Sequence, residues 1–273
     1  MERGLVVLTD LDGTLLDHCT YSFAAAEPAL RLLREKKVPL VLCSSKTRSE
    51  IEVVRSTLDN TDAFIAENGG AVYIPAGYFP QEIMPSSRIP GYDVVEFGTP
   101  YARLLEVFEK IKKLFPGQLR GFHELTPGEV AGLTGLSIPE AEFARKREYD
   151  EPFLLGDMSV LEAVRETARQ SGLNIVRGGR FFHLTGDNDK GRCARFLLRL
   201  YEKSLGRPVD SIGLGDSAND LPLLEAVDFP VLVQKSGGSY DPAIRLQPLY
   251  LAPGEGPAGW RAAILDLVPR LAG

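Results

Sequence analysis

Three short apolar runs alternate with two helical patterns in the first 66 residues, and this order constrains the fold more than any other feature. The runs cover residues 5–9, 38–43 and 63–66. A continuous apolar run of this length is typical of a strand buried on both faces of a sheet. Apolar side chains at helical spacing indicate helices around residues 29–33 and 51–58. Since strands that alternate with helices form parallel sheets, the sequence predicts an α/β fold with a doubly wound, Rossmann-like parallel-sheet core.

The middle of the chain has a different pattern. Residues 75–100 are rich in Pro and Gly, and helical patterns then mix with short strand-like runs. The first pattern returns near the end of the chain. We therefore expect a core of residues 1–83 and 186–273, divided by an inserted α+β cap at residues 84–185. Within the cap, strands are expected at residues 94–97, 152–155, 174–177 and 181–184, and helices at residues 104–115, 139–147 and 160–171.

Charge and cysteine content exclude several classes of function. The chain has 31 Lys and Arg against 37 Asp and Glu, a net charge of −6, so its surface has no general attraction for nucleic acid or an anionic membrane. No apolar run approaches the length of about 18 residues that a membrane span needs, and the first residues are too acidic for a signal peptide. The three cysteines are far apart, at Cys19, Cys43 and Cys193, and suggest neither zinc nor disulfides. We expect a cytoplasmic monomer or homodimer that binds a small molecule.

Polar side chains follow the predicted buried strands. Asp10 and Asp12 come directly after the first strand, and Ser44 follows the second. After the middle region come Lys190 and the acidic segment 216–220, which ends a later strand. Ligands bind at the carboxyl ends of strands in an open parallel sheet, so we expect these side chains to converge on one site.

The order of these motifs, DxDGTL, an apolar strand with Ser, then Lys and GDSxND, resembles the haloacid dehalogenase superfamily of phosphohydrolases. The insertion between the second and third motifs is similar to that of subclass IIB, which has a large α+β cap. Segments 147–153, 178–186, 234–238 and 256–260 are further similar to the mannosyl-3-phosphoglycerate phosphatases. The resemblance implies hydrolysis of mannosyl-3-phosphoglycerate to mannosylglycerate, a compatible solute.

Phosphoryl transfer requires a nucleophile, charge neutralisation and protonation of the leaving group. Asp10 is the predicted nucleophile, because a carboxylate can form a mixed anhydride that water later opens. Asp12 is predicted to protonate the departing alkoxide and then to deprotonate the attacking water. We expect Ser44 to hydrogen-bond a phosphoryl oxygen and Lys190 to neutralise the charge between that oxygen and Asp10.

The same motifs predict a Mg²⁺ cofactor, since oxygen atoms are the ligands that Mg²⁺ prefers. Asp216 is expected to bind the metal together with Asp10 and the backbone carbonyl of Asp12. Asn219 and Asp220 are predicted to hold the metal or its waters.

The predicted substrate is a phosphorylated sugar-glycerate, which has a carboxylate and several hydroxyls besides its phosphate. Arg180 and Lys46 are the candidates for the carboxylate, and Glu148 for the sugar hydroxyls. The full set of candidate substrate-binding residues is Ser45, Lys46, Arg147, Glu148, Arg180 and His183.

Three alternatives remain open from the sequence. The enzyme could act on the glucosyl counterpart or on another sugar phosphate. It could be a phosphotransferase similar to the phosphomannomutases, which share the DxDGT start and the cap position. It could also be a catalytically silent sugar-binding protein, although such a protein has no need of Asp10, Asp12, Ser44, Lys190 and Asp216 together.

Overall fold

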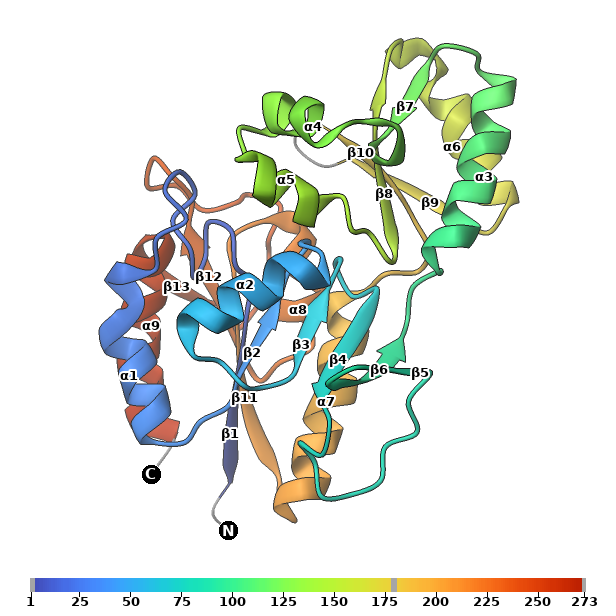
Figure 1. The fold of residues 1–273 in the computed structure, drawn as a ribbon. Helices are drawn as coiled ribbons and strands as arrows, with labels where there is room; N and C mark the ends of the chain where they lie inside the picture. The colour runs from blue at the N-terminus through green and yellow to red at the C-terminus, as the bar shows by residue number, and fades with distance from the viewer. Residues whose placement is uncertain (1–2, 178–180, 272–273) are drawn as a thin grey trace.

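The computed structural model describes residues 3–177 and 181–271, and it confirms the predicted fold class (Figure 1). The strands of the large sheet are β1 (Gly4–Thr9), β2 (Leu40–Cys43), β3 (Phe64–Ala66), β4 (Ala71–Pro75), β5 (Ser87–Ile89), β6 (Tyr92–Glu96), β11 (Val209–Gly215), β12 (Phe229–Gln234) and β13 (Tyr250–Glu255). Their order is β13-β12-β11-β1-β2-β3-β4-β6-β5. The strands from β13 to β3 are parallel, and β4, β6 and β5 continue the sheet in antiparallel pairs.

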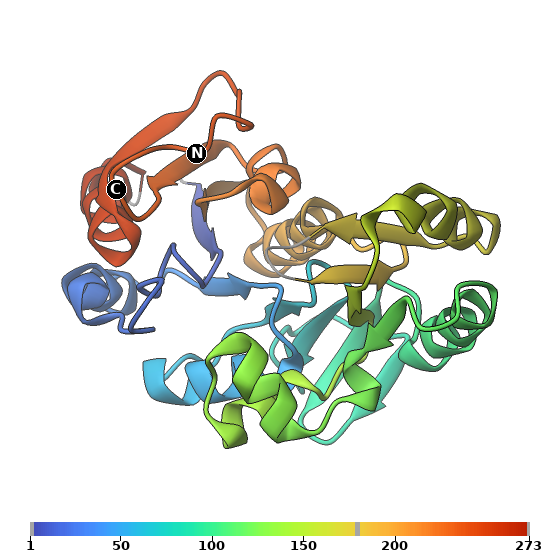
Figure 2. The same ribbon diagram turned by 90° about the horizontal axis from the view of Figure 1, so that it is seen from above.

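Helices cover both faces of this sheet, which explains the continuous apolar run of β1. One face packs against α1 (Glu27–Glu35), α2 (Arg48–Leu58) and α9 (Gly256–Leu271), and the other against α7 (Lys190–Leu205) and α8 (Leu221–Leu224) (Figure 2). Leu5 and Val7 belong to the first cluster, whereas Val6 and Leu8 belong to the second. Every position of β1 is therefore buried, as in other doubly wound sheets.

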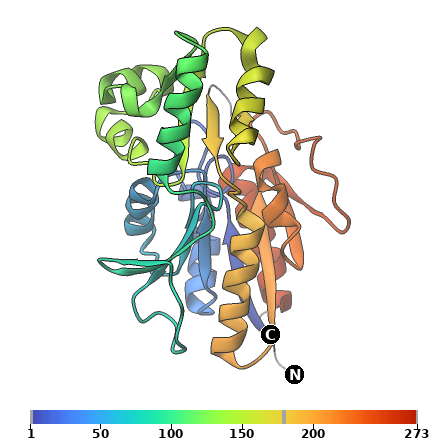
Figure 3. The same cartoon turned by 90° about the vertical axis from the view of Figure 1, so that its right-hand side faces the viewer.

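The cap is a second, smaller unit that lies over the carboxyl ends of the parallel strands (Figures 1 and 3). Its sheet contains β7 (Leu119–Gly121), β8 (Asp150–Leu155), β9 (Asn174–Arg177) and β10 (Phe182–Thr185), in the antiparallel order β7-β8-β10-β9. Helices α3 (Tyr101–Leu114) and α6 (Leu161–Gln170) pack on this sheet, and α4 (Pro127–Thr134) and α5 (Ile138–Ala144) belong to a smaller apolar cluster. Short 3-10 helices occur at Ala24–Ala26, Phe122–Glu124, Met158–Val160 and Ala218–Asp220.

The expected start of the cap at residue 84 needs correction. Strands β5 and β6 lie in the large sheet, where β6 pairs with β4, so the region up to Glu96 belongs with the core. The antiparallel pair β5–β6 is a hairpin within this Pro- and Gly-rich region. Gly91 occupies the turn between β5 and β6 with φ of +86°, a conformation that favours glycine. The cap's own elements run from α3 to β10.

Four of the described strands were not predicted, namely β4, β5, β7 and β13. β13 contains Pro253 and Gly254, which normally argue against a strand, but it is an edge strand, where a missing N–H is tolerated. β4 follows the glycine turn at residues 69–70 and returns antiparallel to β3. Among the described residues, no helix combines the length and the apolar character needed to cross a membrane.

Candidate active site

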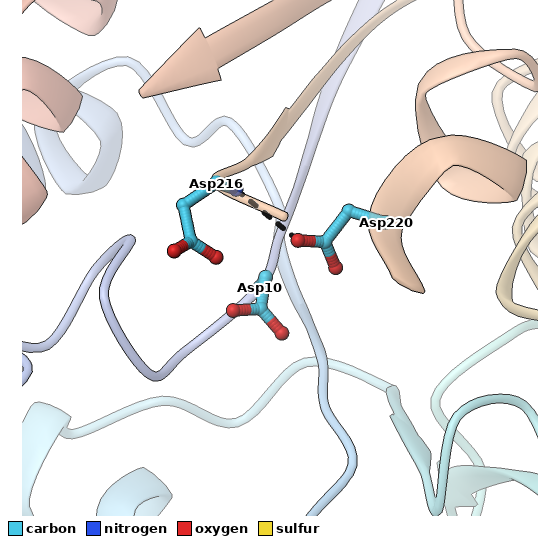
Figure 4. Close-up of side chains that lie close together, drawn as sticks. All are labelled: Asp10, Asp216 and Asp220. Carbon is cyan, nitrogen blue, oxygen red and sulfur yellow. Dashed lines mark hydrogen bonds between the residues drawn. The ribbon is translucent and has the colours of Figure 1, made fainter. Parts of the chain in front are cut away.

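The chemically reactive side chains meet where the central parallel strands end. Asp10 directly follows β1, and both neighbours of β1, the strands β2 and β11, run parallel to it. Ser44 follows β2, and Asp216 follows β11. The backbone N–H of Asp10 donates to the carbonyl of Leu214 at 2.9 Å, which holds this end of β1 against β11. Figure 4 shows Asp216 and Asp10 beside each other, with Asp220 from the following segment.

Lys190, the first residue of α7, is buried between two of these carboxylates. Its Nζ lies 2.8 Å from Oδ1 of Asp10 and 2.7 Å from Oδ1 of Asp220, and its side chain is 1% exposed. Burial opposes the charged form of Lys190, but the two carboxylates outweigh burial and raise its pKa. Burial, followed by the charge of Asp220, raises the pKa of Asp10 to about 8.

Asp10, Asp216 and Asp220 form a cluster whose carboxylate oxygens lie within 4.8 Å of one another. Both oxygens of Asp220 have protein partners. Oδ1 is paired with Lys190, and Oδ2 accepts from the backbone N–H groups of Asp216 and Ser217 at 3.1 and 3.2 Å. Burial and the charge of Asp220 raise the pKa of Asp216. When all three carboxylates are ionised, their charge exceeds that of the one lysine by two in a buried site.

A divalent cation fits this arrangement in both charge and ligand type. Mg²⁺ typically binds one or two protein carboxylates and keeps several waters. Asp10 and Asp216 are the carboxylates suited to hold it, whereas Asp220 is occupied by Lys190 and backbone N–H groups. Gly13 leaves room for the carboxylate of Asp216, since a Cβ at this position would lie 2.9 Å from Oδ2 of Asp216. Asn219 is exposed and accepts a hydrogen bond from Ser217 Oγ at 2.6 Å, so its side chain is directed to that serine.

Asp12, the predicted acid and base, lies beside Lys46. Its Oδ2 is 3.0 Å from Nζ of Lys46, and its Oδ1 is buried without a hydrogen-bond partner among the described residues. The ammonium of Lys46 also lies over the ring of Tyr21, 5.0 Å from its centroid. Ser44 is buried, and its Oγ accepts from the backbone N–H of Lys46 at 3.2 Å. Asp12 and Ser44 are therefore both joined to Lys46 by polar contacts, one to its ammonium and one to its backbone.

Asp10, Asp12, Lys190 and Asp216 line a cleft of about 900 Å³ that has walls from both the core and the cap. The volume is in the usual range for a small-molecule site. The core contributes Asp10, Asp12, Ser45 and Asp216 to its walls, and the cap contributes Val176, Arg177, His183 and Thr185. Ser45 and His183 were both predicted to contact substrate, and both line this cleft.

Three other predicted substrate-binding residues are not among those that line the cleft, namely Lys46, Arg147 and Glu148. Nη1 of Arg147 donates to the backbone carbonyl of Ser45 at 3.2 Å. Glu148 accepts a hydrogen bond from the hydroxyl of Tyr73 at 2.6 Å and pairs with Arg48 at 3.3 Å. Their charged groups have partners at the junction of core and cap, as buried charges generally require. The sixth candidate, Arg180, lies outside the described residues.

The same junction contains residues that the sequence did not reveal as functional. Glu67 has φ of +49° and is 1% exposed, and its two oxygens accept the backbone N–H groups of Glu148 and Tyr149, each at 2.9 Å. Burial raises the pKa of Glu67 to about 8. Nδ2 of Asn188 donates to the carbonyls of Glu67 and Tyr149 at 2.9 and 3.0 Å. The Asn-Gly-Gly turn that follows Glu67 was the available signal, but by itself it indicates only a turn.

Two residues from the end of the chain also approach the site. Nε1 of the buried Trp260 donates to Oγ1 of Thr9 at 3.0 Å, and this hydroxyl donates to the carbonyl of Asp10 at 2.8 Å. Lys235 lines the cleft and pairs with Asp241 at 2.7 Å. The contact of Trp260 could not be read from the sequence, since Thr9 is 251 positions away.

A family model of haloacid dehalogenase-like hydrolases matches residues 7–96. Over 264 residues the chain is 48% identical to a glucosyl-3-phosphoglycerate/mannosyl-3-phosphoglycerate phosphatase of Methanococcoides burtonii, a match that covers 96% of this chain and 97% of the relative. It is 32% identical over 228 residues to a mannosyl-3-phosphoglycerate phosphatase of Pyrococcus horikoshii, covering 84% of this chain and 90% of the relative.

A solved structure from Thermoplasma acidophilum matches with a TM-score of 0.66 and 16% identity, covering 97% of this chain and 98% of the other. At that identity the similarity shows the fold alone. The similarity to the Methanococcoides relative, by contrast, runs through core and cap together. The chain therefore belongs to the haloacid dehalogenase-like hydrolases, in the family of the glucosyl- and mannosyl-3-phosphoglycerate phosphatases.

Proposed function

We propose that the protein is a Mg²⁺-dependent phosphatase that hydrolyses mannosyl-3-phosphoglycerate, and also its glucosyl counterpart, to the glycosylglycerate and phosphate. The observation that carries the proposal is the buried Asp10–Lys190–Asp220 array beside Asp216 at the strand ends. The names of the relatives support the substrate, and the name of the 48% identical relative includes both sugars. The reaction would supply a compatible solute in the cytoplasm, and the enzyme would act as a monomer or homodimer.

In the proposed mechanism, Asp10 attacks phosphorus and the bond from phosphorus to the glycerate oxygen breaks. Asp12 gives its proton to the departing alkoxide. Asp12 then accepts a proton from a water that attacks the aspartyl-phosphate, and the carboxylate of Asp10 is regenerated. Lys190 neutralises charge beside Asp10 throughout, and Ser44 donates to a phosphoryl oxygen. A Mg²⁺ ion held by Asp10 and Asp216, with the carbonyl of Asp12, would neutralise the phosphate charge.

The glycerate carboxylate requires a cation, because a buried and unpaired carboxylate is costly. Lys46 suits this role, since its ammonium already lies 3.0 Å from Asp12 beside the expected phosphate position. Arg180 remains the competing prediction from the sequence. Arg147 and Glu148 are assigned no contact with substrate, because their charges have partners at the junction.

The experiment is a phosphate-release assay on a panel of phosphate esters, with Mg²⁺ and with EDTA. We expect the two glycosyl phosphoglycerates to have the highest kcat/KM, and no activity in EDTA. Asp10→Asn should lower turnover by several orders of magnitude with little change in fold. A phosphotransferase would instead need a bisphosphate activator, so phosphate release without one separates the two functions. More than about a tenth of wild-type turnover in Asp10→Asn would exclude Asp10 as the nucleophile.

A further inference from the structure

The cap contains two histidines that are each hydrogen-bonded through Nδ1 to a buried carboxylate. His183 Nδ1 lies 2.8 Å from Oδ2 of Asp150, and His123 Nδ1 lies 2.7 Å from Oε1 of Glu151. The two side chains are almost equally exposed, at 24% and 25%. Only His183 is among the residues that line the cleft, whereas the ring of His123 packs against Phe108. The two histidines thus share the contact at Nδ1 and differ in location, and Nε2 of His123 also contacts Glu109 at 3.3 Å.

The pair of His183 and Asp150 is connected to the phosphate side of the cleft. Nη1 of Arg147 lies 3.4 Å from Oδ2 of Asp150 and also donates to the carbonyl of Ser45 at 3.2 Å. Ser45 lies next to Ser44, the proposed partner of the phosphoryl group. A continuous series of polar contacts therefore runs from the core segment beside the phosphate, through Arg147 and Asp150, to His183 on β10.

Strand pairing places His183 on the side of the cap sheet that faces the cleft. His183 is opposite Val176 in the β9–β10 pair, and residues directly opposite each other share one face of a sheet. Both residues line the cleft. The neighbouring residues Phe182 and Leu184 point the other way, into the apolar cluster beneath α3 and α6. Because successive side chains of β10 point to opposite faces, the imidazole of His183 is on the face toward the cleft. The hydrogen bond to Asp150 then sets the orientation of the ring.

Asp150 also determines which nitrogen of the neutral ring carries the proton. An ionised carboxylate only accepts, so Nδ1 must be the donor and Nε2 is left as an acceptor. Nη1 of Arg147 lies 3.4 Å from Oδ2 of Asp150, and this cation favours the ionised carboxylate. Within the described part of the chain, Nε2 has no hydrogen-bond partner. An acceptor that faces a cleft, with a negative charge behind it, suits a hydroxyl group better than a carboxylate.

We propose that His183 binds a hydroxyl of the sugar moiety through Nε2 and that Asp150 and Arg147 are positioning residues that hold it there. This inference rests on the proposed function and assigns the sugar end of the same substrate to the cap. It separates that end from the glycerate carboxylate, which is assigned to Lys46 or Arg180. His183 then contributes to selection between substrates, while the chemistry stays with the core residues.

The test compares His183→Ala with wild type on three substrates: a glycosyl-3-phosphoglycerate, 3-phosphoglycerate without the sugar, and p-nitrophenyl phosphate. We expect kcat/KM for the glycosyl substrate to fall about 10- to 100-fold, while the other two change less than about threefold. His123→Ala is the matched control and should leave the ratio between the three substrates unchanged.

Asp150→Asn tests the positioning role. An amide can donate to Nδ1 and so move the ring proton to Nε2, which would turn the acceptor into a donor. We expect Asp150→Asn to lose activity on the glycosyl substrate alone. In the double variant with His183→Ala, kcat/KM should be little lower than in His183→Ala by itself. Fully additive losses in the double variant would mean that Asp150 acts independently of His183 and would overturn its positioning role.

Other outcomes overturn the assignment of His183 itself. A loss shared by the glycosyl substrate and 3-phosphoglycerate would mean that His183 binds the carboxylate. Equal losses on all three substrates would mean that it serves the fold or the phosphate. Failure of the proposed function would instead be visible in the wild type, as hydrolysis of p-nitrophenyl phosphate without hydrolysis of the glycosyl substrate, and would overturn this inference with it.

Discussion

Replacement of Lys190 by methionine tests how the buried charges of the site depend on one another. The ammonium of Lys190 lies 2.8 Å from Asp10 and 2.7 Å from Asp220, and all three side chains are less than a tenth exposed. Removing one partner of a buried ion pair typically costs about 3–5 kcal/mol of stability. Because the two carboxylates can take up a proton instead of staying charged, we expect the lower end of that range, about 3 kcal/mol at neutral pH.

The assay is thermal unfolding in EDTA, with Lys203→Met as the control, since Lys203 is an exposed lysine of the same helix. A loss of about 3 kcal/mol corresponds to a fall in Tm of about 6–12 °C for a chain of this size. The defect should shrink as the pH is lowered, because protonation neutralises the facing carboxylates. Mg²⁺ should raise the Tm of Lys190→Met more than that of wild type. A Tm within about 1 °C of wild type in EDTA would refute the reasoning, because the array would then be insensitive to its only lysine.

Two further changes test the metal ligand and the junction. Asp216→Ala should raise the Mg²⁺ concentration for half-maximal activity at least about tenfold, measured by titration after EDTA treatment, and an unchanged value would exclude Asp216 as a ligand. Glu67 has a folded-state pKa of about 8 against an ordinary value of 4.5, so the folded protein binds more protons than the unfolded chain between these pH values. The unfolding free energy of wild type relative to Glu67→Gln should therefore fall by up to about 1.4 kcal/mol per pH unit as pH rises through this window, measured by urea denaturation. A difference that is independent of pH would contradict the burial argument.

The core of the site could be predicted because its residues follow strands that are recognisable by themselves. The apolar run before Asp10 and the run before Ser44 each define a strand buried on both faces, and parallel strands end at one edge. Their convergence thus follows from local sequence and a general rule of sheet topology. The edge strand β13 could not be predicted in this way, because Pro253 and Gly254 are unfavourable in most strands and are tolerated here only by its position.

The roles of cap residues could not be predicted, because they depend on partners distant in sequence. Arg147 and Glu148 have the charged side chains expected of substrate-binding residues. Arg147 nevertheless contacts Ser45, 102 positions away in the sequence, and Glu148 contacts Tyr73, 75 positions away. Nothing in the local pattern distinguishes a cation directed at substrate from one directed at the core. Asp150 was likewise invisible as a partner of His183, since the pairing of β8 with β10 brings the two together.

The high pKa of Asp10 and its proposed role as a nucleophile have one physical origin. Burial removes the water that would stabilise the carboxylate, which raises its pKa to about 8 when no divalent cation is bound. A cation beside Asp10 and Asp216 would favour the charged form and restore the carboxylate at neutral pH. The restored carboxylate would be poorly solvated, so little water would have to leave before it approached phosphorus. The negative charge of Asp216 and Asp220 that Lys190 does not balance would also repel a phosphate dianion until a cation was present. In the proposed function, the arrangement of Asp10, Asp216, Asp220 and Lys190 would therefore make both substrate binding and the reactivity of Asp10 depend on the metal.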